Sequence, residues 1–303
     1  MIRYVACVAE AAELNDKSME VKLADPSGFC FGVKRAVDGV YEKLKSGRPI
    51  YTFGPVVHNE TVVSDLEQKG VKVIDDKDTL ERTELEKDAC IIIRAHGVGR
   101  DIYALLEKKG CETADFTCPF VARIHNIVLE ESSKGRHIVI VGKASHPEIV
   151  GICGWCDGPY TVVADEQEAE RLDLSGEITV VAQTTFQYRK FSQIVEIINK
   201  KGYNANVVNT ICSATKDRQD AAEVLSKEAD AMIVIGGSAS SNTRKLYEIA
   251  SENCPNTVCI QKPDDLRNYK LPESVKLIGI TAGASTPQNI IEEVQRYVRG
   301  TYF

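Results

Sequence analysis

The fold of this chain is decided by the stretch VKLADPSGFCFGVKRAVDGVYEKL, residues 21–44. A short apolar run at 21–24 leads into a loop that ends at Cys30. Apolar side chains then recur at 33, 37, 40 and 44, the three- and four-residue spacing of an amphipathic helix. This stretch therefore predicts a unit of strand, cysteine-bearing loop and helix.

The same unit recurs twice more along the chain. Cys118 follows a strand-like run at 113–116, Cys212 follows one at 205–208, and a helical pattern comes after each. The three cysteines are 88 and 94 residues apart, and self-similarity at a nearly fixed period indicates one structural unit used several times. We expect an extension at 1–18 and three domains, each with one of these cysteines, at 19–110, 111–204 and 205–303.

Short unbroken apolar runs predict further strands. Such runs are typical of parallel strands that are buried on both faces of a sheet. Because strands alternate with helices, the sequence predicts an α/β fold built from small parallel sheets. The runs lie at 91–93, 138–141, 180–182, 232–235 and 277–280.

Composition limits the class of protein. With 303 residues, of which 43% are hydrophobic and 27% charged, the chain is too long for one core, so two or three domains are expected. Its net charge of −7 argues against nucleic acid or an anionic membrane as the main partner, and no apolar run has the length of a transmembrane helix. Ten cysteines are few for a disulfide scaffold of this length, which favours a reducing cytoplasm and metal or catalytic use of the thiols.

Polar residues recur at fixed distances from the three cysteines. His58, His146 and Ser240 each come 28 residues after a cysteine, and His96 and Thr184 come 66 residues after the first two. In the third unit the corresponding loop comes 73 residues after its cysteine, so the repeat is imperfect there. Ligands of open α/β sheets bind outside the carboxyl ends of the strands, so we expect the cysteines and the polar loops to share one site.

Three thiolates at a shared centre point to a metal-cluster enzyme. Their wide spacing excludes the ferredoxin pattern, in which several ligands lie within roughly a dozen residues. Three thiolates leave one iron of a cubane cluster without a protein ligand, and an open position distinguishes a catalytic metal centre from a structural one. The helix that starts after each cysteine points its free amides at the sulfur, which we expect to lower the pKa of the thiol.

The other cysteines have simpler explanations. Cys153 and Cys156 form Cys-Gly-Trp-Cys, a thioredoxin-like spacing and the strongest rival redox site. This pair lacks a preceding thioredoxin-like unit, and no second C-x-x-C completes a zinc site. The remaining cysteines lie in apolar runs or in the extension, and we expect them simply to be buried: Cys7, Cys90, Cys111, Cys254 and Cys259.

Some of the polar segments also have local explanations. Glu148 follows Pro147 at a predicted helix start, where a carboxylate can merely complement the helix dipole. The glycine-containing loop at 236–242 resembles an anion-cradling turn, but such a turn alone is weak evidence, as it is for the loop at 281–285. A single loop histidine would be explained best by local hydrogen bonds. Only the matched positions of these residues favour a shared ligand site.

Taken together, these motifs resemble one family of enzymes. From about residue 20 to residue 299 the chain is similar to the 4-hydroxy-3-methylbut-2-enyl diphosphate reductases, which catalyse the last step of the non-mevalonate isoprenoid route. Residues 1–18 lie outside the match, and Cys153 and Cys156 are not part of the family motif. The resemblance rests on the segments 28–33, 57–59, 95–98, 117–119, 146–148, 183–185, 211–212, 240–242 and 281–285.

The resemblance implies a fold, a cofactor and a reaction. Members of the family have three α/β domains related by a pseudo-threefold axis around one 4Fe-4S cluster, which Cys30, Cys118 and Cys212 would bind here. Ferredoxin or flavodoxin would deliver two electrons, one at a time. With two protons, these electrons would remove the allylic hydroxyl of the substrate as water and give isopentenyl or dimethylallyl diphosphate.

The resemblance also implies roles for the polar residues. Neutral donors would hold the diphosphate, Thr184 would lie near the substrate hydroxyl, and Glu148 would be the proton source. The implied catalytic residues are Glu148, Thr184 and His146. The implied substrate-binding residues are His58, His96, His146, Thr184, Ser240, Ser241, Asn242 and Ser285.

Two other functions fit parts of the pattern. Quinolinate synthase also has three pseudo-symmetric domains with one cluster cysteine each, but it needs groups that bind carboxylates, and the polar loops contain no arginine. An iron-sulfur redox sensor or electron carrier needs a cluster but has no use for three histidines and a Ser-Ser-Asn turn. A diphosphate ligand that perturbs the spectrum of the cluster would distinguish the reductase from both.

Overall fold

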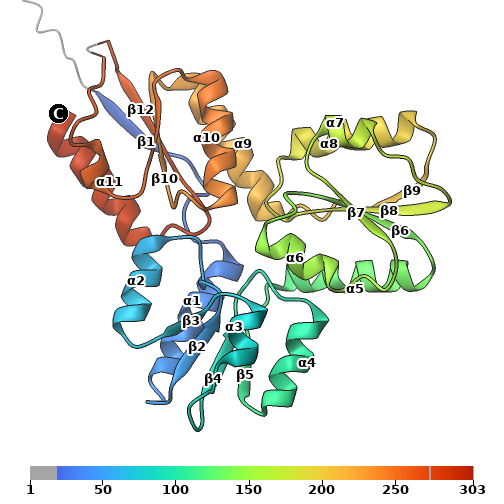
Figure 1. Cartoon of the computed structure of the whole chain (residues 1–303). Coiled ribbons are helices and arrows are strands. Elements are labelled where there is room, and N and C mark those ends of the chain that lie inside the picture. The colour runs from blue at the N-terminus through green and yellow to red at the C-terminus, as the bar shows by residue number, and fades with distance from the viewer. Residues whose placement is uncertain (1–18, 273, 303) are drawn as a thin grey trace, which may run out of the picture.

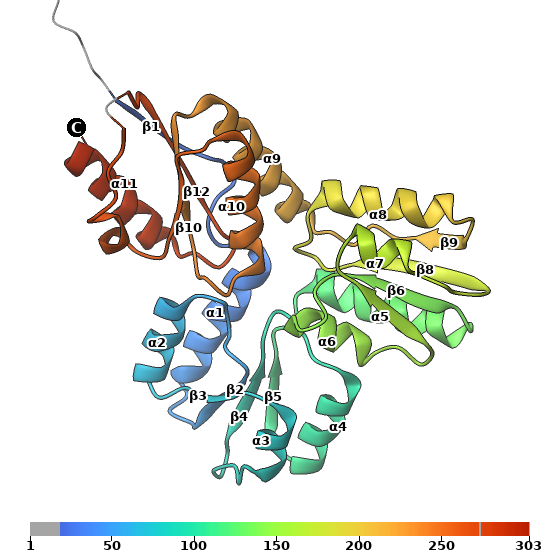
Figure 2. The ribbon, with the colours of Figure 1, turned by 45° about the horizontal axis from the view of Figure 1, so that its top comes forward.

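Three small parallel sheets make up the structure, a computed structural model that describes residues 19–272 and 274–302. The predicted extension at 1–18 lies outside the described residues. Each sheet has four strands and, with its helices, forms one of three lobes that meet at the centre (Figure 1). Figure 2 shows the same three lobes from a second direction. The predicted α/β fold with small parallel sheets is confirmed.

The first two sheets each lie between two pairs of helices. The first sheet has the order β3-β2-β4-β5 and contains β2 (Ile50–Phe53), β3 (Lys72–Ile74), β4 (Cys90–Ile93) and β5 (Glu112–Asp115). Its helices are α1 (Phe31–Leu44), α2 (Glu60–Gln68), α3 (Lys77–Arg82) and α4 (Arg100–Lys109). The second sheet has the order β7-β6-β8-β9 and contains β6 (His137–Val141), β7 (Tyr160–Val163), β8 (Glu177–Ala182) and β9 (Asn204–Val207). Its helices are α5 (Pro119–Ser133), α6 (Pro147–Cys153), α7 (Glu166–Glu170) and α8 (Tyr188–Lys200).

The third sheet repeats this strand order with one strand taken from the start of the described chain. Its order is β1-β12-β10-β11, so β1 takes the edge position that β5 and β9 hold in the other sheets. The strands are β1 (Glu20–Leu23), β10 (Ala231–Ile235), β11 (Thr257–Ile260) and β12 (Leu277–Ala282). The helices are α9 (Ser213–Glu228), α10 (Ser241–Asn253), the 3₁₀ helix η1 (Pro263–Leu266) and α11 (Gln288–Tyr302).

The chain passes from one sheet to the next at each of the three repeated cysteines. Each cysteine follows an edge strand (β1, β5 or β9) and precedes a helix that packs on the following sheet. The predicted boundaries therefore need correction at the strands. β5 falls in the predicted second domain but pairs with β4 of the first sheet, and the boundary at 204/205 cuts β9, which pairs with β8. β1 falls in the predicted first domain but pairs with β12.

The predicted apolar runs form the centres of the sheets. All four residues of β4 are fully buried, as are residues 138–141 of β6, because helices cover both faces. The stripe predicted for α1 is also confirmed, since Val37 and Val40 pack on the first sheet. None of the helices in the described part of the chain is both long enough and apolar enough to cross a membrane.

Candidate active site

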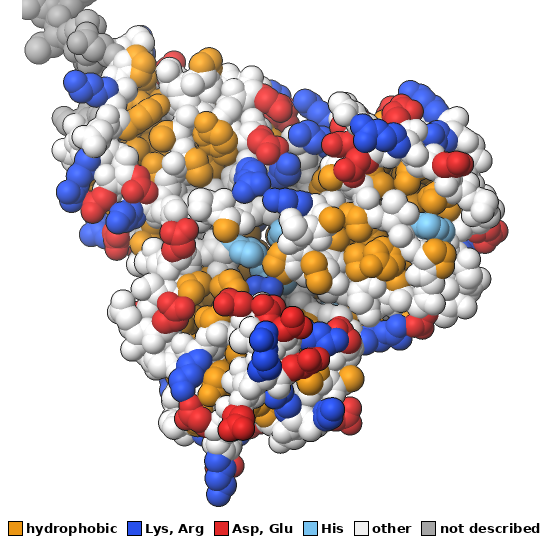
Figure 3. Space-filling model, viewed as in Figure 1, with side chains coloured by type: hydrophobic (Ala, Val, Ile, Leu, Met, Phe, Trp, Pro, Cys, Tyr) orange, Lys and Arg blue, Asp and Glu red, His pale blue; other side chains and the backbone are white. Residues whose placement is uncertain are grey.

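A cavity lies where the three lobes meet. It contains about 730 Å³ of empty space, part of which is open to solvent, and histidine side chains are visible in the hollow between the lobes (Figure 3). Every residue predicted for the site lines this one cavity, although the residues come from all three lobes. They are Cys30, His58, His96, Cys118, His146, Glu148, Thr184, Cys212, Ser240, Ser241, Asn242 and Ser285.

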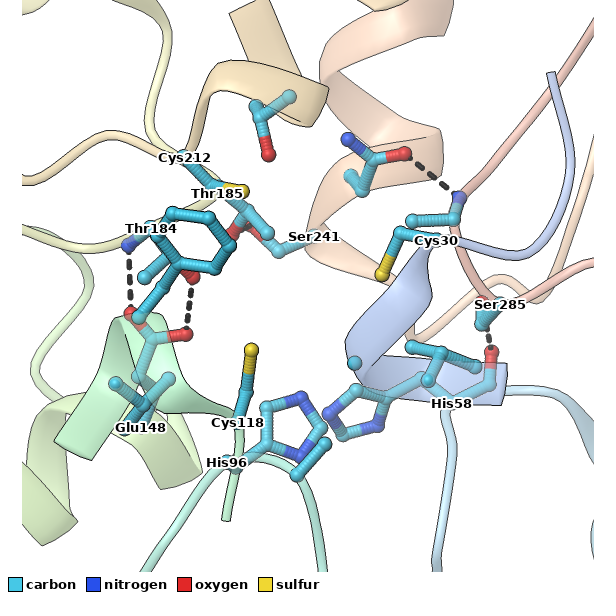
Figure 4. Close-up of a pocket in the computed structure, with 18 of the residues that line it drawn as sticks. Cys30, His58, His96, Cys118, Glu148, Thr184, Thr185, Cys212, Ser241 and Ser285 are labelled. Atoms are coloured by element: carbon cyan, nitrogen blue, oxygen red, sulfur yellow. Dashed lines mark hydrogen bonds between the residues drawn. The ribbon is translucent and has the colours of Figure 1, made fainter. Parts of the chain in front are cut away.

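The three cysteines reach the cavity from equivalent places in the fold. Each is the N-cap residue of a helix, at the start of α1, α5 or α9, and none is in a disulfide. Their sulfur atoms point into the same space (Figure 4). A Cβ atom at Gly32 would lie 2.7 Å from the Sγ atom of Cys118, so only glycine lets α1 approach this sulfur closely. Three facing thiols are a donor set that suits an iron-sulfur cluster.

The pKa of two of these thiols departs from the prediction. Backbone amides at the start of α5 and α9 do lower the pKa of Cys118 and Cys212, as expected. Burial raises the pKa of both thiols by more, so the net shift is upward. Without bound metal, desolvation of a thiolate therefore outweighs the helix amides.

Three histidines form a second group, here called the histidine cluster (His58, His96 and His146). Their ring centroids are 4.8 to 5.7 Å apart, and one ring nitrogen of each lies within 4.8 Å of the others. The Nδ1 atom of His146 accepts a hydrogen bond from the backbone N–H of Glu148 at 3.2 Å, which places the proton of a neutral ring on Nε2. The cluster can therefore donate hydrogen bonds into the cavity without carrying charge.

Burial keeps the histidine cluster neutral. It lowers the pKa of His58 to about 4 and that of His146 to about 3, and it holds the pKa of His96 well below its usual value. Three buried polar atoms in the cavity wall have no hydrogen-bond partner among the described residues: Nε2 of His58, Nδ1 of His96 and Nδ2 of Asn242. Buried polar atoms are nearly always paired, so three orphans in one cavity indicate a polar ligand.

The same cavity contains the carboxyl pair (Glu148 with Thr184). The backbone N–H and the Oγ1 hydroxyl of Thr184 donate to the two carboxylate oxygens of Glu148, both at 2.6 Å (Figure 4). Glu148 is in the first turn of α6 and is only 2% exposed. Burial raises its pKa to about 7, although both hydrogen bonds act in the opposite direction. This carboxyl group can therefore hold a proton at neutral pH and release it within the cavity.

The Ser-Ser-Asn turn lies at the start of α10. The side chain of Ser240 caps this helix by accepting from the backbone N–H of Thr243, and Oδ1 of Asn242 accepts from the backbone N–H of Ala284 at 2.8 Å. Ser285 donates to the backbone oxygen of His58 at 3.3 Å. These contacts join two lobes and leave the amide nitrogen of Asn242 free to donate.

The structure adds residues that the sequence patterns missed. Thr185 and Thr215 also line the cavity. Thr185 donates to the Oγ atom of Ser241 at 3.2 Å and accepts from Nε2 of Gln183 at 2.8 Å. Gln183 and Thr185 belong to the segment 183–185, one of the segments on which the family resemblance rests. Nothing in the sequence, however, shows that these two side chains bond to Ser241 while Thr184 bonds to Glu148. Arg94 lies close behind the histidine cluster, where it lowers the pKa of all three rings.

The rival cysteine pair does not line this cavity. Burial raises the pKa of Cys153, and it raises that of Cys156 to about 12. Redox-active pairs contain a thiol of lowered pKa, so these two cysteines lack that property. Of the cysteines that we expected to be buried, Cys90 and Cys254 are buried, Cys111 is half-buried and Cys259 is exposed, so the expectation was wrong for Cys259. Cys7 lies outside the described residues.

Fold and cavity together define a class of protein. This is an α/β protein of three like units whose cysteines and histidines face one shared cavity. The chain belongs to the LytB protein family, whose model matches residues 21–299.

Individual relatives agree in name. A curated relative from Caldanaerobacter subterraneus subsp. tengcongensis, named 4-hydroxy-3-methylbut-2-enyl diphosphate reductase, is 45% identical over 91% of this chain and 95% of its own length. The solved structure of the E-1-hydroxy-2-methyl-but-2-enyl-4-diphosphate reductase from Plasmodium falciparum has a TM-score of 0.86 at 29% identity and covers 94% of this chain and 89% of that one. A solved (E)-4-hydroxy-3-methyl-but-2-enyl diphosphate reductase, the terminal enzyme of the non-mevalonate pathway, has a TM-score of 0.66 at 38% identity and covers 93% and 99%. The predicted family is confirmed.

Proposed function

We propose that this chain removes the allylic hydroxyl of 4-hydroxy-3-methylbut-2-enyl diphosphate by reduction. The substrate takes up two electrons and two protons, its C–O bond breaks, the oxygen leaves as water, and isopentenyl or dimethylallyl diphosphate forms. One observation carries the proposal: three free cysteines share a cavity with three orphaned polar nitrogens and a carboxyl group that can hold a proton. The names of the relatives support it.

The cysteines would hold the cofactor. We propose that Cys30, Cys118 and Cys212 bind one 4Fe-4S cluster through their Sγ atoms, because all three are free and face the same space. When bound, such a cluster supplies electrons and a Lewis-acidic iron for the leaving oxygen. Ferredoxin or flavodoxin is the proposed electron donor, and the free thiols of the described chain suit a reducing cytoplasm.

The histidine cluster and the start of α10 would hold the diphosphate. Nε2 of His58, the ring of His96 and Nδ2 of Asn242 lack partners and can donate to phosphate oxygens. Ser240, Ser241 and Ser285 add hydroxyl donors. Among the described residues that line the cavity none is Lys or Arg. This lining disfavours the quinolinate synthase reaction, whose carboxylate groups call for cationic partners.

The carboxyl pair would supply a proton. Burial raises the pKa of Glu148 to about 7, so this carboxyl group can take up and release a proton near neutral pH. Thr184 holds both carboxylate oxygens in place, and both residues line the cavity, which suits a proton transfer toward the leaving oxygen.

An anaerobic turnover assay tests the proposal. Iron-replete protein, dithionite-reduced viologen and the hydroxy diphosphate should together give viologen oxidation and both isoprenoid diphosphates. Inorganic pyrophosphate should inhibit competitively, because it retains the group that the histidine cluster binds. Absence of turnover by protein that holds its cluster would refute the proposal.

A further inference from the structure

Arg94 is a buried cation without a counter-ion close behind the cavity wall. It follows β4, precedes the turn that carries His96, and is 7% exposed. Its Nη1 atom donates to the backbone oxygen of Pro55 at 3.2 Å, but its Nε atom has no partner. Within the residues described, no carboxylate forms an ion pair with it, although Asp75 acts on it electrostatically. Burying a charge is costly unless it is paired, so this guanidinium calls for an explanation.

The local fold makes room for this side chain. Gly54 has a φ of +70°, and a Cβ atom at this position would collide with the guanidinium group. Both the left-handed backbone and the empty space at Gly54 therefore favour glycine. The sequence thus maintains a place for Arg94 beneath the loop that leads to His58.

Arg94 also remains charged in this place. Burial lowers its pKa to about 10, which still leaves it protonated at neutral pH. Its charge lies close to the cavity, because Arg94 directly precedes Ala95 and His96, which line it, and bonds the backbone of Pro55, three residues before His58. In line with this place, it lowers the pKa of all three rings of the histidine cluster. Lys143 adds a smaller effect of the same sign on His146.

We propose that Arg94 is a positioning residue that supplies the positive potential for the diphosphate from behind the histidine cluster. This inference rests on the proposed function. The neutral histidines and the amide of Asn242 fix where the phosphate oxygens lie, but none of them balances the negative charge of a diphosphate. Among the described residues, Arg94 is the cation that acts on all three rings, and a fixed charge at the back of the site attracts the anion without entering the cavity.

Three variants separate the charge of Arg94 from its hydrogen bond. Arg94→Lys keeps the charge, Arg94→Gln keeps a donor for the oxygen of Pro55, and Arg94→Met keeps neither. We expect Arg94→Gln and Arg94→Met to weaken the binding of inorganic pyrophosphate to the cluster-loaded protein by about 10- to 100-fold. This is the size expected for loss of one unit charge near an anion. We expect the pyrophosphate affinity of Arg94→Lys to stay within about threefold of that of the parent protein, since lysine retains the charge.

Anaerobic calorimetry with pyrophosphate and with inorganic phosphate is the measurement, together with iron content and the separate values of KM and kcat. The charge model predicts a larger loss for pyrophosphate than for phosphate, and a rise in KM with iron retained. Arg48→Met is the matched control, because Arg48 is on the same lobe, contacts Glu112 and the backbone of Asp88, and does not line the cavity. It should bind pyrophosphate like the parent.

Specific results would overturn the inference. If Arg94→Gln binds pyrophosphate as the parent does, the positive charge is not what strengthens binding. The same holds if Arg94→Lys loses as much affinity as Arg94→Met. In either case Arg94 only supports the loop. If Arg94→Met fails to fold, the difference in pyrophosphate affinity between Arg94→Lys and Arg94→Gln still tests the role of the charge. Failure of the proposed function shows separately, since a parent protein that does not reduce the hydroxy diphosphate can still bind pyrophosphate in a manner that depends on Arg94.

Discussion

The histidine cluster and the carboxyl pair lie in the same cavity but differ in how their polar atoms are satisfied. His58 and His96 each leave a buried ring nitrogen without a partner, whereas both carboxylate oxygens of Glu148 accept short hydrogen bonds from Thr184. Unpaired donors leave room for a ligand to complete them, and a fully bonded carboxyl group is fixed in one orientation. This difference fits the proposed roles, in which the first group would bind the diphosphate and the second would transfer a proton.

Burial shifts the pKa values of the two groups in opposite directions, but in both it favours the uncharged form. It lowers the pKa of the histidines and raises that of Glu148. Both shifts favour the uncharged form, so the histidines are neutral at pH 7 and Glu148 carries less negative charge than an exposed carboxylate would, while Arg94 stays charged behind the histidine cluster. An anionic ligand in this cavity would therefore contact neutral hydrogen-bond donors, with the charge of Arg94 behind them.

The largest expected effect lies in the sulfur atoms that both groups face. Substituting Cys30, Cys118 or Cys212 by serine should abolish both iron binding and turnover, because three thiolates are needed to hold the cluster. Anaerobic iron analysis of the parent should give about four irons per chain. Cys153→Ser and Cys156→Ser are the controls and should keep iron and activity. Loss of iron in these two variants alone would show that the ligands are assigned wrongly.

The next largest effect concerns the carboxyl pair. Glu148→Gln keeps the shape and the hydrogen bonds but lacks the transferable proton, so kcat should fall at least about 100-fold while iron content and KM persist. Because the raised pKa is about 7 and the protonated form donates, kcat of the parent should be high below pH 7 and fall about tenfold per unit above it. The variant should lack this dependence.

Glu60 offers a matched control for Glu148. It is also a glutamate in the first turn of a helix, α2, but it is exposed and has no contact with Thr184. Glu60→Gln should turn over within about threefold of the parent, because complementing a helix dipole affects stability and not rate. A Glu148→Gln rate equally close to that of the parent would return Glu148 to the dipole explanation.

A smaller effect is expected for the unpaired donors. His58→Ala and Asn242→Ala should each weaken pyrophosphate binding by about 10- to 150-fold, the range for one hydrogen bond to a charged group of about 1.5 to 3 kcal/mol. Iron content should be unchanged, because neither side chain is a thiol ligand. His137→Ala is the control, since His137 lies in β6, outside the cavity, and contacts Thr161. Unchanged affinity in both test variants would contradict a diphosphate site.

Spacing was enough to predict that the cysteines, the histidines, Thr184 and Ser240 meet in the cavity, whereas Ser241, Asn242 and Ser285 were assigned to the site through the family resemblance. The cysteines and histidines follow strand ends, and parallel sheets bring such ends together, so spacing alone indicated a shared site. The edge strands that precede the three cysteines were predicted from the repeat, whereas the edge strand β3, with only Lys72, Val73 and Ile74, was not, because it has neither a long apolar run nor a cysteine after it. The pairing of β1 with β12 joins residues more than 250 positions apart, and no local pattern reports such a contact.

Side-chain direction and burial were the other limits. Arg94 sits one residue before a noted motif, yet nothing in the sequence shows that its guanidinium turns inward over Gly54. The upward pKa shift of Cys118 likewise depends on how completely three lobes enclose it, whereas the sequence showed only the helix amides that act in the other direction. Both the direction of the Arg94 side chain and the pKa of Cys118 are set by contacts between segments that are far apart in the sequence.

The smallest predicted effect tests whether the proposed diphosphate site depends on hydrogen bonds between lobes. Thr185, from the second lobe, donates to the Oγ atom of Ser241 at the start of α10, in the third lobe. Thr185→Val keeps the shape of the side chain but loses this neutral hydrogen bond of about 0.5 to 1.5 kcal/mol, so KM should rise about 2- to 12-fold with kcat and iron unchanged. Thr185→Ser keeps the hydroxyl and should restore the parent KM. If Ser241→Ala raises KM and Thr185→Val does not, the contact from Thr185 plays no part in binding, and the hydrogen bond that Gln183 donates to the Oγ atom of Ser241 at 3.3 Å is the remaining contact between these two lobes at Ser241.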